Sequence, residues 1–197
     1  MTAPEPAQPV SRLNIANIIT MARIALVPFF AWALLAAGWQ PIESLPKRWI
    51  AVVIFVVAAC TDKVDGSLAR SRGLITDLGK LLDPIADKAL VGVSLVLLWF
   101  PLRELPFWVP LLVLVREFGI TFMRMGLKRY EVMPAGRGGK LKTVLQTIAI
   151  GLFLLPFHSF TWFHVLAWVV MILAVALTVI TGVDYALKGW KIHTEHR

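Results

Sequence analysis

The amino-acid sequence predicts an all-α integral membrane protein built from six transmembrane helices. Hydrophobic residues make up 58% of the 197 residues and charged residues only 16%, whereas soluble domains carry about 25% charged residues. The apolar residues stand in long runs. At roughly 20 residues per span, with short connections, the chain has room for about six helices and for no separate soluble domain.

The chain divides into a short tail, one helical domain and a second short tail. Residues 1–12 are expected to be disordered, because prolines recur there and no apolar run is present. Residues 13–190 form a single six-helix transmembrane domain, and residues 191–197 form a basic tail. The spans are expected at residues 13–37, 49–70, 80–100, 107–127, 141–157 and 163–187.

The second span is the least regular, because its apolar part, Trp49–Cys60, is too short to cross a bilayer. The helix becomes long enough only if it continues through the polar segment Thr61–Arg70. In that case Asp62 and Asp65 fall on one face of the helix. The glycine-containing turn 72–79 then separates this helix from the third span.

Basic residues are distributed unequally between the two sides of the expected bundle. Lys47, Arg48 and Arg103 fall in the connections on one side, and the other Lys and Arg residues fall toward the opposite side. Because positive residues concentrate on the cytoplasmic side, we expect both termini to be cytoplasmic. The net charge of +8 follows from this bias, so we expect no nucleic-acid partner.

The single cysteine, Cys60, excludes an intramolecular disulfide and is expected to be a small packed residue.

Four aspartates stand in the polar segments that adjoin the second and third spans. Asp62 and Asp65 are three residues apart, so they share one helical face. Asp83 and Asp87 are four residues apart and share a face of the next helix. Four carboxylates at membrane depth need compensating cations, and an all-oxygen ligand set favours Mg²⁺, Mn²⁺ or Ca²⁺. The alternative, four solvated acids in a loop, leaves the paired spacing unexplained.

A pair of metal ions held by carboxylates is typical of displacement at phosphorus, because the ions neutralise phosphate oxygens and stabilise the leaving group. Gly66 and Ala69 remove side-chain bulk beside the acids, so that a ligand can approach the helix. Arg70 adds a planar donor for phosphate. Intramembrane acids also mark ion pathways, so a cation- or proton-coupled transporter is the alternative from a different class. Against it, the four acids cluster at one membrane side instead of lining a path.

Together the two polar segments contain eight specified residues at fixed spacings, Asp62-x2-Asp65-Gly66-x2-Ala69-Arg70-x8-Gly79-x3-Asp83-x3-Asp87. This pattern resembles the signature of the CDP-alcohol phosphotransferases at every fixed position. The resemblance implies a six-helix, dimeric enzyme that transfers a phosphatidyl or similar group from a CDP-linked donor to an alcohol. It implies that the four aspartates hold two Mg²⁺ or Mn²⁺ ions and that Asp87 also deprotonates the acceptor hydroxyl. Gly66, Ala69 and Arg70 would contact the CDP moiety.

Three further segments carry polar residues into the expected spans. They read Asn14-Ile-Ala-Asn17-x2-Thr20-x2-Arg23, Arg116-Glu117-x6-Arg124 and Gly139-Lys140-Leu-Lys142-Thr143-x2-Gln146. All three resemble segments of the bacterial phosphatidylglycerophosphate synthases, although Ala16 replaces the proline of that subfamily. The resemblance implies that Asn17 contacts the nucleotide. Asn14 is explained equally well as a helix cap.

The acceptor site is expected in the last two of these segments. Intramembrane arginines need partners, and Glu117 can pair with one arginine of its segment while the other faces the ligand. Lysine and threonine side chains near a helix N-terminus suit a phosphate group. The alternative is that the lysines only anchor the helix at lipid headgroups. The residues predicted to bind the acceptor phosphate are Arg116, Arg124, Lys140, Lys142 and Thr143.

The resemblance implies CDP-diacylglycerol and sn-glycerol 3-phosphate as substrates, and residues 13–190 as the catalytic domain of a homodimer. It also implies a place in the bacterial inner membrane, with lipid around the helices and the active site on the cytoplasmic side. Direct displacement is favoured over a covalent intermediate, because no dedicated nucleophile stands beside the acids. A related enzyme that uses inositol phosphate, phosphatidylglycerol or serine as its acceptor is the nearest alternative.

Overall fold

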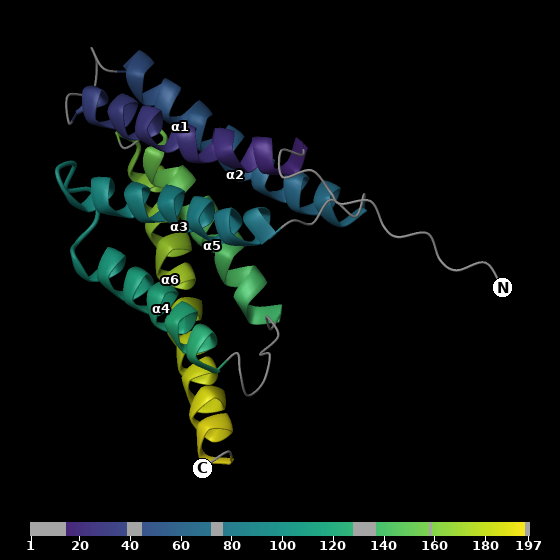
Figure 1. Cartoon of the computed structure of the whole chain (residues 1–197). Helices are drawn as coiled ribbons and strands as arrows, with labels where there is room; N and C mark the ends of the chain where they lie inside the picture. Colours follow the sequence, from purple (N-terminus) through teal and green to yellow (C-terminus); the bar gives the residue numbers. More distant parts are fainter. Residues whose placement is uncertain (1–14, 39–44, 72–76, 128–136, 158, 196–197) are drawn as a thin grey trace.

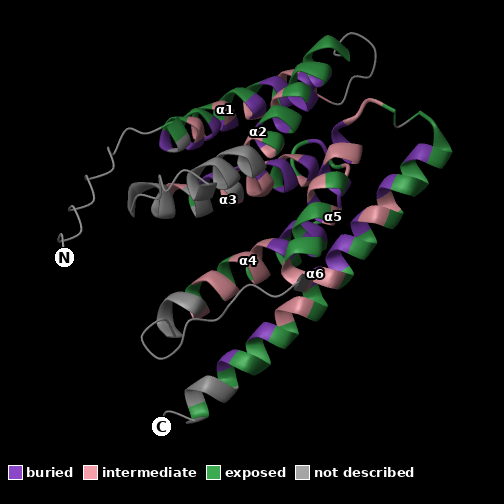
Figure 2. Cartoon of the chain, turned by 90° about the vertical axis from the view of Figure 1, so that its right-hand side faces the viewer, coloured by how far each residue is buried: buried purple, intermediate pink, exposed green. Residues whose placement is uncertain are grey.

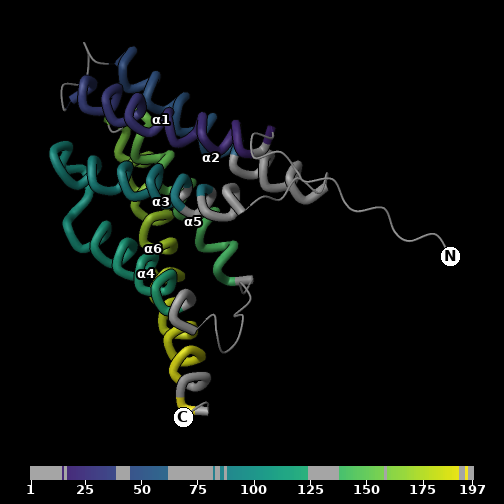
Figure 3. Tube along the Cα trace, viewed as in Figure 1, coloured from purple at the N-terminus to yellow at the C-terminus, as the bar shows by residue number. Residues whose placement is uncertain are grey.

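The structure is a computed structural model that describes residues 15–38, 45–71, 77–127, 137–157 and 159–195 (Figure 3). Inside the helices, the side chains at positions 16, 62–71, 77–81, 83–84, 87, 124–127, 137, 191–193 and 195 lie outside this description. The described residues form six α-helices and no strand, which confirms the predicted all-α class. The helices are α1 (Ile15–Ala37), α2 (Leu45–Ser71), α3 (Asp77–Trp99), α4 (Trp108–Leu127), α5 (Arg137–Leu154) and α6 (Thr161–Glu195).

Successive helices run in alternating directions, so the bundle has two ends (Figure 1). At one end α1, α3 and α5 begin and α2, α4 and α6 finish; we call it the motif end, because the aspartates of the signature lie toward it. We call the opposite end, at the upper left of Figure 1, the aromatic end. There the ring centroids of Trp49 and Phe157 are 5.9 Å apart, and those of Trp99 and Phe107 are 5.0 Å apart. Helix α1 packs against α2 and α3, while α6 packs against α4 and α5.

Several helix boundaries differ from the prediction. Helix α2 begins at Leu45 rather than at 49, because Pro46 fits the first turn of a helix, where its missing N–H has no helical partner. Helices α3 and α5 also begin early, so that Gly79 and Gly139 are helical instead of forming turns. A helical glycine costs only about 1 kcal/mol relative to alanine, so neither residue ends its helix. Helix α5 ends at 154 instead of 157, since Pro156 disfavours continuation.

The last helix is longer than predicted. It has 35 residues and continues to Glu195, so the predicted basic tail at 191–197 is helical through most of its length. Its final turns still contain polar and charged residues, which is why the apolar pattern alone ended near residue 187. Helical hydrogen bonding continues past the apolar run, because the composition of these turns includes good helix formers such as lysine and alanine.

The outer surface of the bundle is apolar, as expected for an integral membrane protein. The segments Asn17–Ala37 and Thr161–Trp190 are each long and apolar enough to cross a bilayer. Exposed side chains include Trp32 on α1, Phe122 on α4 and Ile180 on α6, each more than half exposed. A surface of this kind is unfavourable in water and is expected against lipid. Figure 2 shows exposed and buried residues alternating along α6, which packs against its neighbours on one side only.

At the aromatic end, an arginine joins the start of α2 to the end of α5 and to the connection between α3 and α4. Arg48, at the start of α2, donates hydrogen bonds to the carbonyl oxygens of Phe153 (2.9 Å) and Leu154 (3.0 Å), the last residues of α5. Its guanidinium also lies 2.6 Å from a carboxylate oxygen of Glu104 in the connection between α3 and α4. Carbonyls at a helix C-terminus lack helical partners, so Arg48 caps α5 while it pairs with Glu104.

Candidate active site

The aspartates of the signature lie on two helices, as predicted. Asp62 and Asp65 stand in the C-terminal part of α2, which confirms that the polar segment extends the second helix. Asp83 and Asp87 stand in the first half of α3. The side chains of all four lie outside the described ones, so their roles remain predictions. The same holds for the predicted CDP contacts Gly66, Ala69 and Arg70.

The helical backbone at both aspartate pairs fits a divalent cation. Because α2 and α3 are regular helices at these positions, the spacings of three and four residues keep each pair on one face. Carboxylate oxygens are the ligands that Mg²⁺ and Mn²⁺ prefer. Among the described side chains, no group of three or more His, Cys, Asp or Glu residues lies together. The four aspartates of the signature therefore remain the predicted metal ligands.

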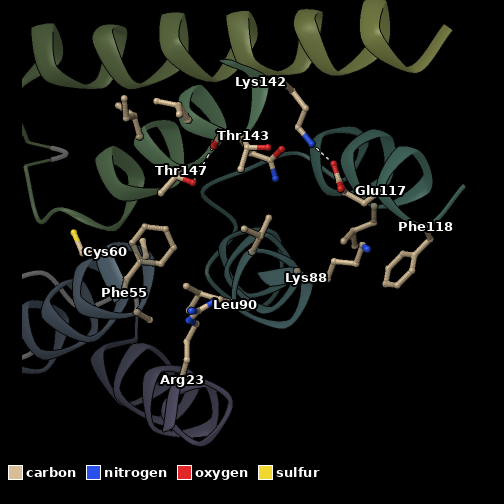
Figure 4. A pocket seen from close by; sticks show the side chains of 18 residues that line it. Arg23, Phe55, Cys60, Lys88, Leu90, Glu117, Phe118, Lys142, Thr143 and Thr147 are labelled. Carbon is tan, nitrogen blue, oxygen red and sulfur yellow. Dashed lines mark hydrogen bonds and ion pairs between the residues drawn. The ribbon is translucent and has the colours of Figure 1, made fainter. Parts of the chain in front are cut away.

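A cavity of about 500 Å³ lies beside the signature, and helices α1 to α5 all contribute to its wall (Figure 4). Cys60 and Lys88 line it, and they stand two residues before Asp62 and directly after Asp87. The wall is mostly apolar, with Phe55 from α2 and other aliphatic and aromatic side chains. Its described polar lining residues are Arg23, Cys60, Lys88, Glu117, Lys142, Thr143, Gln146 and Thr147.

The first helix brings three buried polar residues to the bundle. Asn17, Thr20 and Arg23 are each only 2% exposed, and their spacing of three residues places them along one side of α1. Arg23 reaches the cavity on the side opposite Lys142 in Figure 4. The structure thus brings Arg23 to the site, whereas the predicted contact of Asn17 with the nucleotide remains a prediction.

A buried lysine marks the far side of the cavity. The side chain of Lys142, on α5, is 3% exposed, and its ammonium forms an ion pair with Oε1 of Glu117 on α4 (Figure 4). The same carboxylate oxygen accepts a hydrogen bond from Nη1 of Arg116 at 3.1 Å, which confirms that Glu117 pairs with an arginine of its own segment. Lys88 and Arg116 repel Lys142 electrostatically, whereas Glu117 attracts it.

The other residues predicted for the acceptor occupy different places. Thr143 lines the cavity and donates a hydrogen bond to the carbonyl oxygen of Gly139 at 3.0 Å. Lys140 is exposed on α5, and the side chain of Arg124 lies outside the described ones. Arg116 lies between α4 and α6, where its Nη2 donates to Oγ1 of Thr181 at 3.0 Å.

Sequence reasoning assigned no role to several residues of the cavity. Arg23 and Gln146 were part of the quoted segments but were given no function, and Glu117 was expected to pair with an arginine but not to line the cavity. Gln146 is 3% exposed, lines the cavity, and its Oε1 has no hydrogen-bond partner among the described atoms. Lys88 was missed entirely. A basic residue directly after Asp87, at the start of an apolar run, was the signal that could have found it, because intramembrane charges are functional by default.

Comparison with known proteins agrees with the signature and the bundle. The family model of the CDP-alcohol phosphatidyltransferases matches residues 13–180. A probable phosphatidylglycerophosphate synthase of Mycobacterium tuberculosis is 46% identical over 189 residues, covering 94% of this chain and 88% of that protein. A CDP-diacylglycerol–glycerol-3-phosphate 3-phosphatidyltransferase of Bacillus subtilis is 40% identical over 191 residues, covering 90% and 96%. One from Rickettsia felis is 33% identical over 177 residues, covering 87% and 93%. The chain therefore belongs to the CDP-alcohol phosphatidyltransferase family.

Proposed function

We propose that this chain transfers the phosphatidyl group of CDP-diacylglycerol to sn-glycerol 3-phosphate, with phosphatidylglycerophosphate and CMP as products. The observation that carries the proposal is the cavity beside the signature, which combines apolar walls with the buried cations Arg23 and Lys142 on opposite sides. Apolar walls suit a lipid donor, and two separate cations suit the phosphates of a nucleotide-linked donor and of a phosphorylated acceptor. The relatives from Bacillus subtilis and Rickettsia felis carry this activity in their names.

The proposed reaction is a direct displacement at phosphorus. The free primary hydroxyl of glycerol 3-phosphate attacks the β-phosphorus of the donor, a new P–O bond forms, and the P–O bond to CMP breaks. Asp87 accepts the hydroxyl proton, since a carboxylate within reach of the nucleophile can act as general base. Asn17, Gly66, Ala69 and Arg70 hold the CDP moiety.

Asp62, Asp65, Asp83 and Asp87 hold a pair of divalent ions, Mg²⁺ or Mn²⁺. When bound, such ions neutralise the phosphate oxygens and stabilise the leaving group. The aspartates supply the oxygen ligands from two helices. Small residues beside them leave room for the nucleotide, and the guanidinium of Arg70 offers a planar donor to its phosphates.

The acceptor phosphate is bound at the end of the cavity where α4 and α5 face each other. Lys142 supports this assignment best, because its ammonium is buried and faces the cavity. Thr143 lines the same wall and adds a hydroxyl. A serine or inositol acceptor without phosphate would leave these cations unused. The full proposed acceptor set is Arg116, Arg124, Lys140, Lys142 and Thr143.

The setting we propose is the bacterial inner membrane, with the chain as a homodimer. The motif end faces the cytoplasm, where CMP and glycerol 3-phosphate are soluble. The distribution of basic residues supports this orientation, because Lys47, Arg48 and Arg103 are the cations assigned to the opposite side.

An acceptor panel with purified protein tests the activity. The protein is supplied with CDP-diacylglycerol in mixed micelles, Mg²⁺ or Mn²⁺, and either glycerol 3-phosphate, inositol phosphate, phosphatidylglycerol or serine. We expect CMP release and a new phospholipid with glycerol 3-phosphate. CMP release with inositol phosphate but not with glycerol 3-phosphate would show that the proposed acceptor is wrong.

The role of Asp87 is tested by Asp87→Asn, which keeps the size of the side chain but removes its basicity. Turnover should be abolished while the thermal unfolding temperature in detergent stays near that of the wild type. Asp184→Asn is the matched control, because this exposed aspartate on α6 pairs with Lys188 at 2.8 Å. Retained turnover in Asp87→Asn excludes Asp87 as the base.

A further inference from the structure

We propose that the last helix positions the acceptor lysine through a chain of three contacts. Thr181, Gly182 and Tyr185 of α6 hold Arg116, Arg116 holds Glu117, and Glu117 holds Lys142 in the cavity. The inference rests on the proposed function, in which Lys142 binds the acceptor phosphate. It makes the residues of α6 positioning residues, since they act on the acceptor through Arg116.

The first contact fixes the guanidinium of Arg116 on α6. Oγ1 of Thr181 lies 2.6 Å from the carbonyl oxygen of Leu177, to which its hydroxyl proton is donated. A hydroxyl also has acceptor lone pairs, and the same oxygen accepts the hydrogen bond from Nη2 of Arg116 at 3.0 Å. The guanidinium carbon lies 5.8 Å from the centroid of the buried Tyr185 ring, within the range of a cation–π interaction.

Two glycines allow the helices to come this close. A Cβ on Gly182 would lie 3.1 Å from Cγ of Arg116, so the aliphatic stem of the arginine runs directly along α6. A Cβ on Gly138 of α5 would lie 3.1 Å from Cγ2 of Thr181. Both α4 and α5 pack against α6, whereas in the described residues α4 and α5 meet through the Glu117–Lys142 ion pair and not through close backbone contact. Helix α6 is therefore the common support of the two helices that carry Glu117 and Lys142.

The second and third contacts pass from Arg116 into the cavity. Adjacent residues on a helix point in different directions, so Arg116 faces α6 while Glu117 lies in the cavity wall. Among the described residues that line the cavity, Glu117 and Lys142 are present and Arg116 is not. One oxygen of Glu117 accepts from both cations. This shared carboxylate links the position of the arginine to that of the lysine.

Glu117 also offsets part of the electrostatic cost of placing Lys142 in the cavity. Burial disfavours an ammonium group, and Lys88 and Arg116 repel it, whereas Glu117 attracts it. A lysine stem has large rotamer freedom, and a paired carboxylate reduces this freedom before the ligand binds. An ordered cation binds a phosphate with less loss of entropy. The expected effect of loosening α6 is therefore weaker acceptor binding with little change in donor binding or in the chemical step.

Replacement of Thr181 by valine tests the first contact, since it removes the oxygen that accepts from Arg116. We expect the KM for glycerol 3-phosphate to rise about three- to tenfold, less than for direct loss of a hydrogen bond to a charged group, because Thr181 acts on the acceptor only through Arg116 and Glu117. The kcat and the KM for CDP-diacylglycerol should change by less than about twofold on the same basis, and Thr181→Ser should restore the wild-type KM. Thr178→Val is the matched control, because the buried hydroxyl of Thr178 donates to the carbonyl oxygen of Ala174 in its own helix.

Replacement of Gly182 by alanine tests the same contact without weakening the helix. Alanine is the better helix former by about 1 kcal/mol, so helix propensity alone would leave stability equal or improved and the KM unchanged. Positioning predicts instead a raised KM for glycerol 3-phosphate, because the new Cβ displaces Arg116. Gly119→Ala on α4 is the control, since a Cβ there meets nothing within 4 Å.

A double-mutant cycle decides whether Thr181 acts through Glu117. Glu117→Gln should itself raise the KM for glycerol 3-phosphate, and adding Thr181→Val to it should produce no further rise. If the KM increases of the two single variants multiply in the double variant, the two residues act independently and the proposal is wrong. An equal effect of Thr178→Val, or a parallel rise in the KM for CDP-diacylglycerol, would also overturn it. If the wild-type protein does not use glycerol 3-phosphate, only the proposed function is refuted. The KM values of the variants are then compared with the acceptor that the protein does use.

Discussion

The two ends of the bundle each contain a partly buried Arg–Glu pair, and the two pairs differ in what surrounds them. At the aromatic end, Arg48 meets Glu104 and the two terminal carbonyl oxygens of α5. At the motif end, Arg116 meets Glu117, which also pairs with a second cation, Lys142. The first pair joins backbone ends, whereas the second adjoins a cavity.

The difference teaches how to separate a structural ion pair from one that serves a ligand. Arg48 directs its donors to carbonyls that need partners wherever a helix ends, so the pair completes the fold. At the motif end, Glu117 pairs with two cations, Arg116 and Lys142, and the buried Lys142 also lines the cavity. A cation that lines a cavity can bind an anionic group there. This pair therefore adjoins a charge that a ligand can reach.

The largest expected effect is a loss of stability on breaking the Arg48–Glu104 pair at the aromatic end. Arg48→Met leaves Glu104 and two helix-terminal carbonyls without their cation, and removing one partner of a buried ion pair costs about 3–5 kcal/mol. We expect a large fall in the unfolding temperature in detergent, and an unchanged KM for glycerol 3-phosphate in the protein that remains folded. A variant as stable as the wild type would show that the cap does not stabilise the bundle.

The next effect concerns the cavity. Lys142→Met keeps much of the length and the apolar stem of the lysine but removes the charge. We expect the KM for glycerol 3-phosphate to rise about ten- to a hundredfold, because a hydrogen bond to a charged group contributes about 1.5–3 kcal/mol. Stability should fall less than in Arg48→Met. An unchanged KM would remove Lys142 from the acceptor site, and Lys140→Met, at an exposed position on the same helix, provides the comparison.

The two ends should also differ in their response to a thiol reagent. Cys60 is the single cysteine, is exposed and lines the cavity, so a maleimide bound there should reduce turnover, and CDP-diacylglycerol should slow the labelling. Cys60→Ser should be active and resistant. In that background, Trp162→Cys adds an exposed thiol at the aromatic end, and its labelling should leave turnover intact. Full activity after complete labelling of Cys60 would contradict occupation of the cavity by substrate.

The smallest effect is on the pH dependence of stability. Burial raises the pKa of the Glu104 carboxyl above its ordinary value, and attraction to Arg48 offsets only part of the rise. The native state then holds this proton more tightly than the unfolded state, so stability falls as pH increases from the ordinary pKa through the native one. Glu104→Gln should flatten this part of the curve, measured as unfolding temperature against pH. The exposed control Asp184→Asn should keep the slope.

The sequence predicted the number, order and main extent of the helices, because long apolar runs and short connections leave few alternatives. The continuation of α2 through Asp62 was predicted from the length a span needs, and the helix confirms it. The starts of α2 and α5 were predicted too late. Residues 45–48, with Pro46, were left outside the second span although a proline fits the first turn of a helix, and Gly138 was left outside the fifth span although it lies close to Thr181 of α6.

The site was predicted in part. Local spacing was enough to place the aspartates on two helices and to pair Glu117 with Arg116, because these relations span a few residues. The contact of Arg116 with Thr181 joins residues 65 positions apart, and nothing in α6 resembles a ligand-binding segment. The cavity position of Lys88 depends on how α3 packs among its neighbours. Relations of this kind arise from the packed bundle and have no counterpart in a short motif.

The length of α6 has a consequence for depth in the bilayer. A rise of about 1.5 Å per residue makes its 35 residues about 52 Å long, whereas the hydrocarbon layer is about 30 Å thick. If Thr161 stands at one boundary of that layer, Thr181 lies about 30 Å along the helix, at the opposite boundary. The side chains gathered around Arg116 are then level with the headgroups. Glycerol 3-phosphate can reach them from aqueous solution, while the acyl chains of CDP-diacylglycerol remain in the hydrocarbon layer.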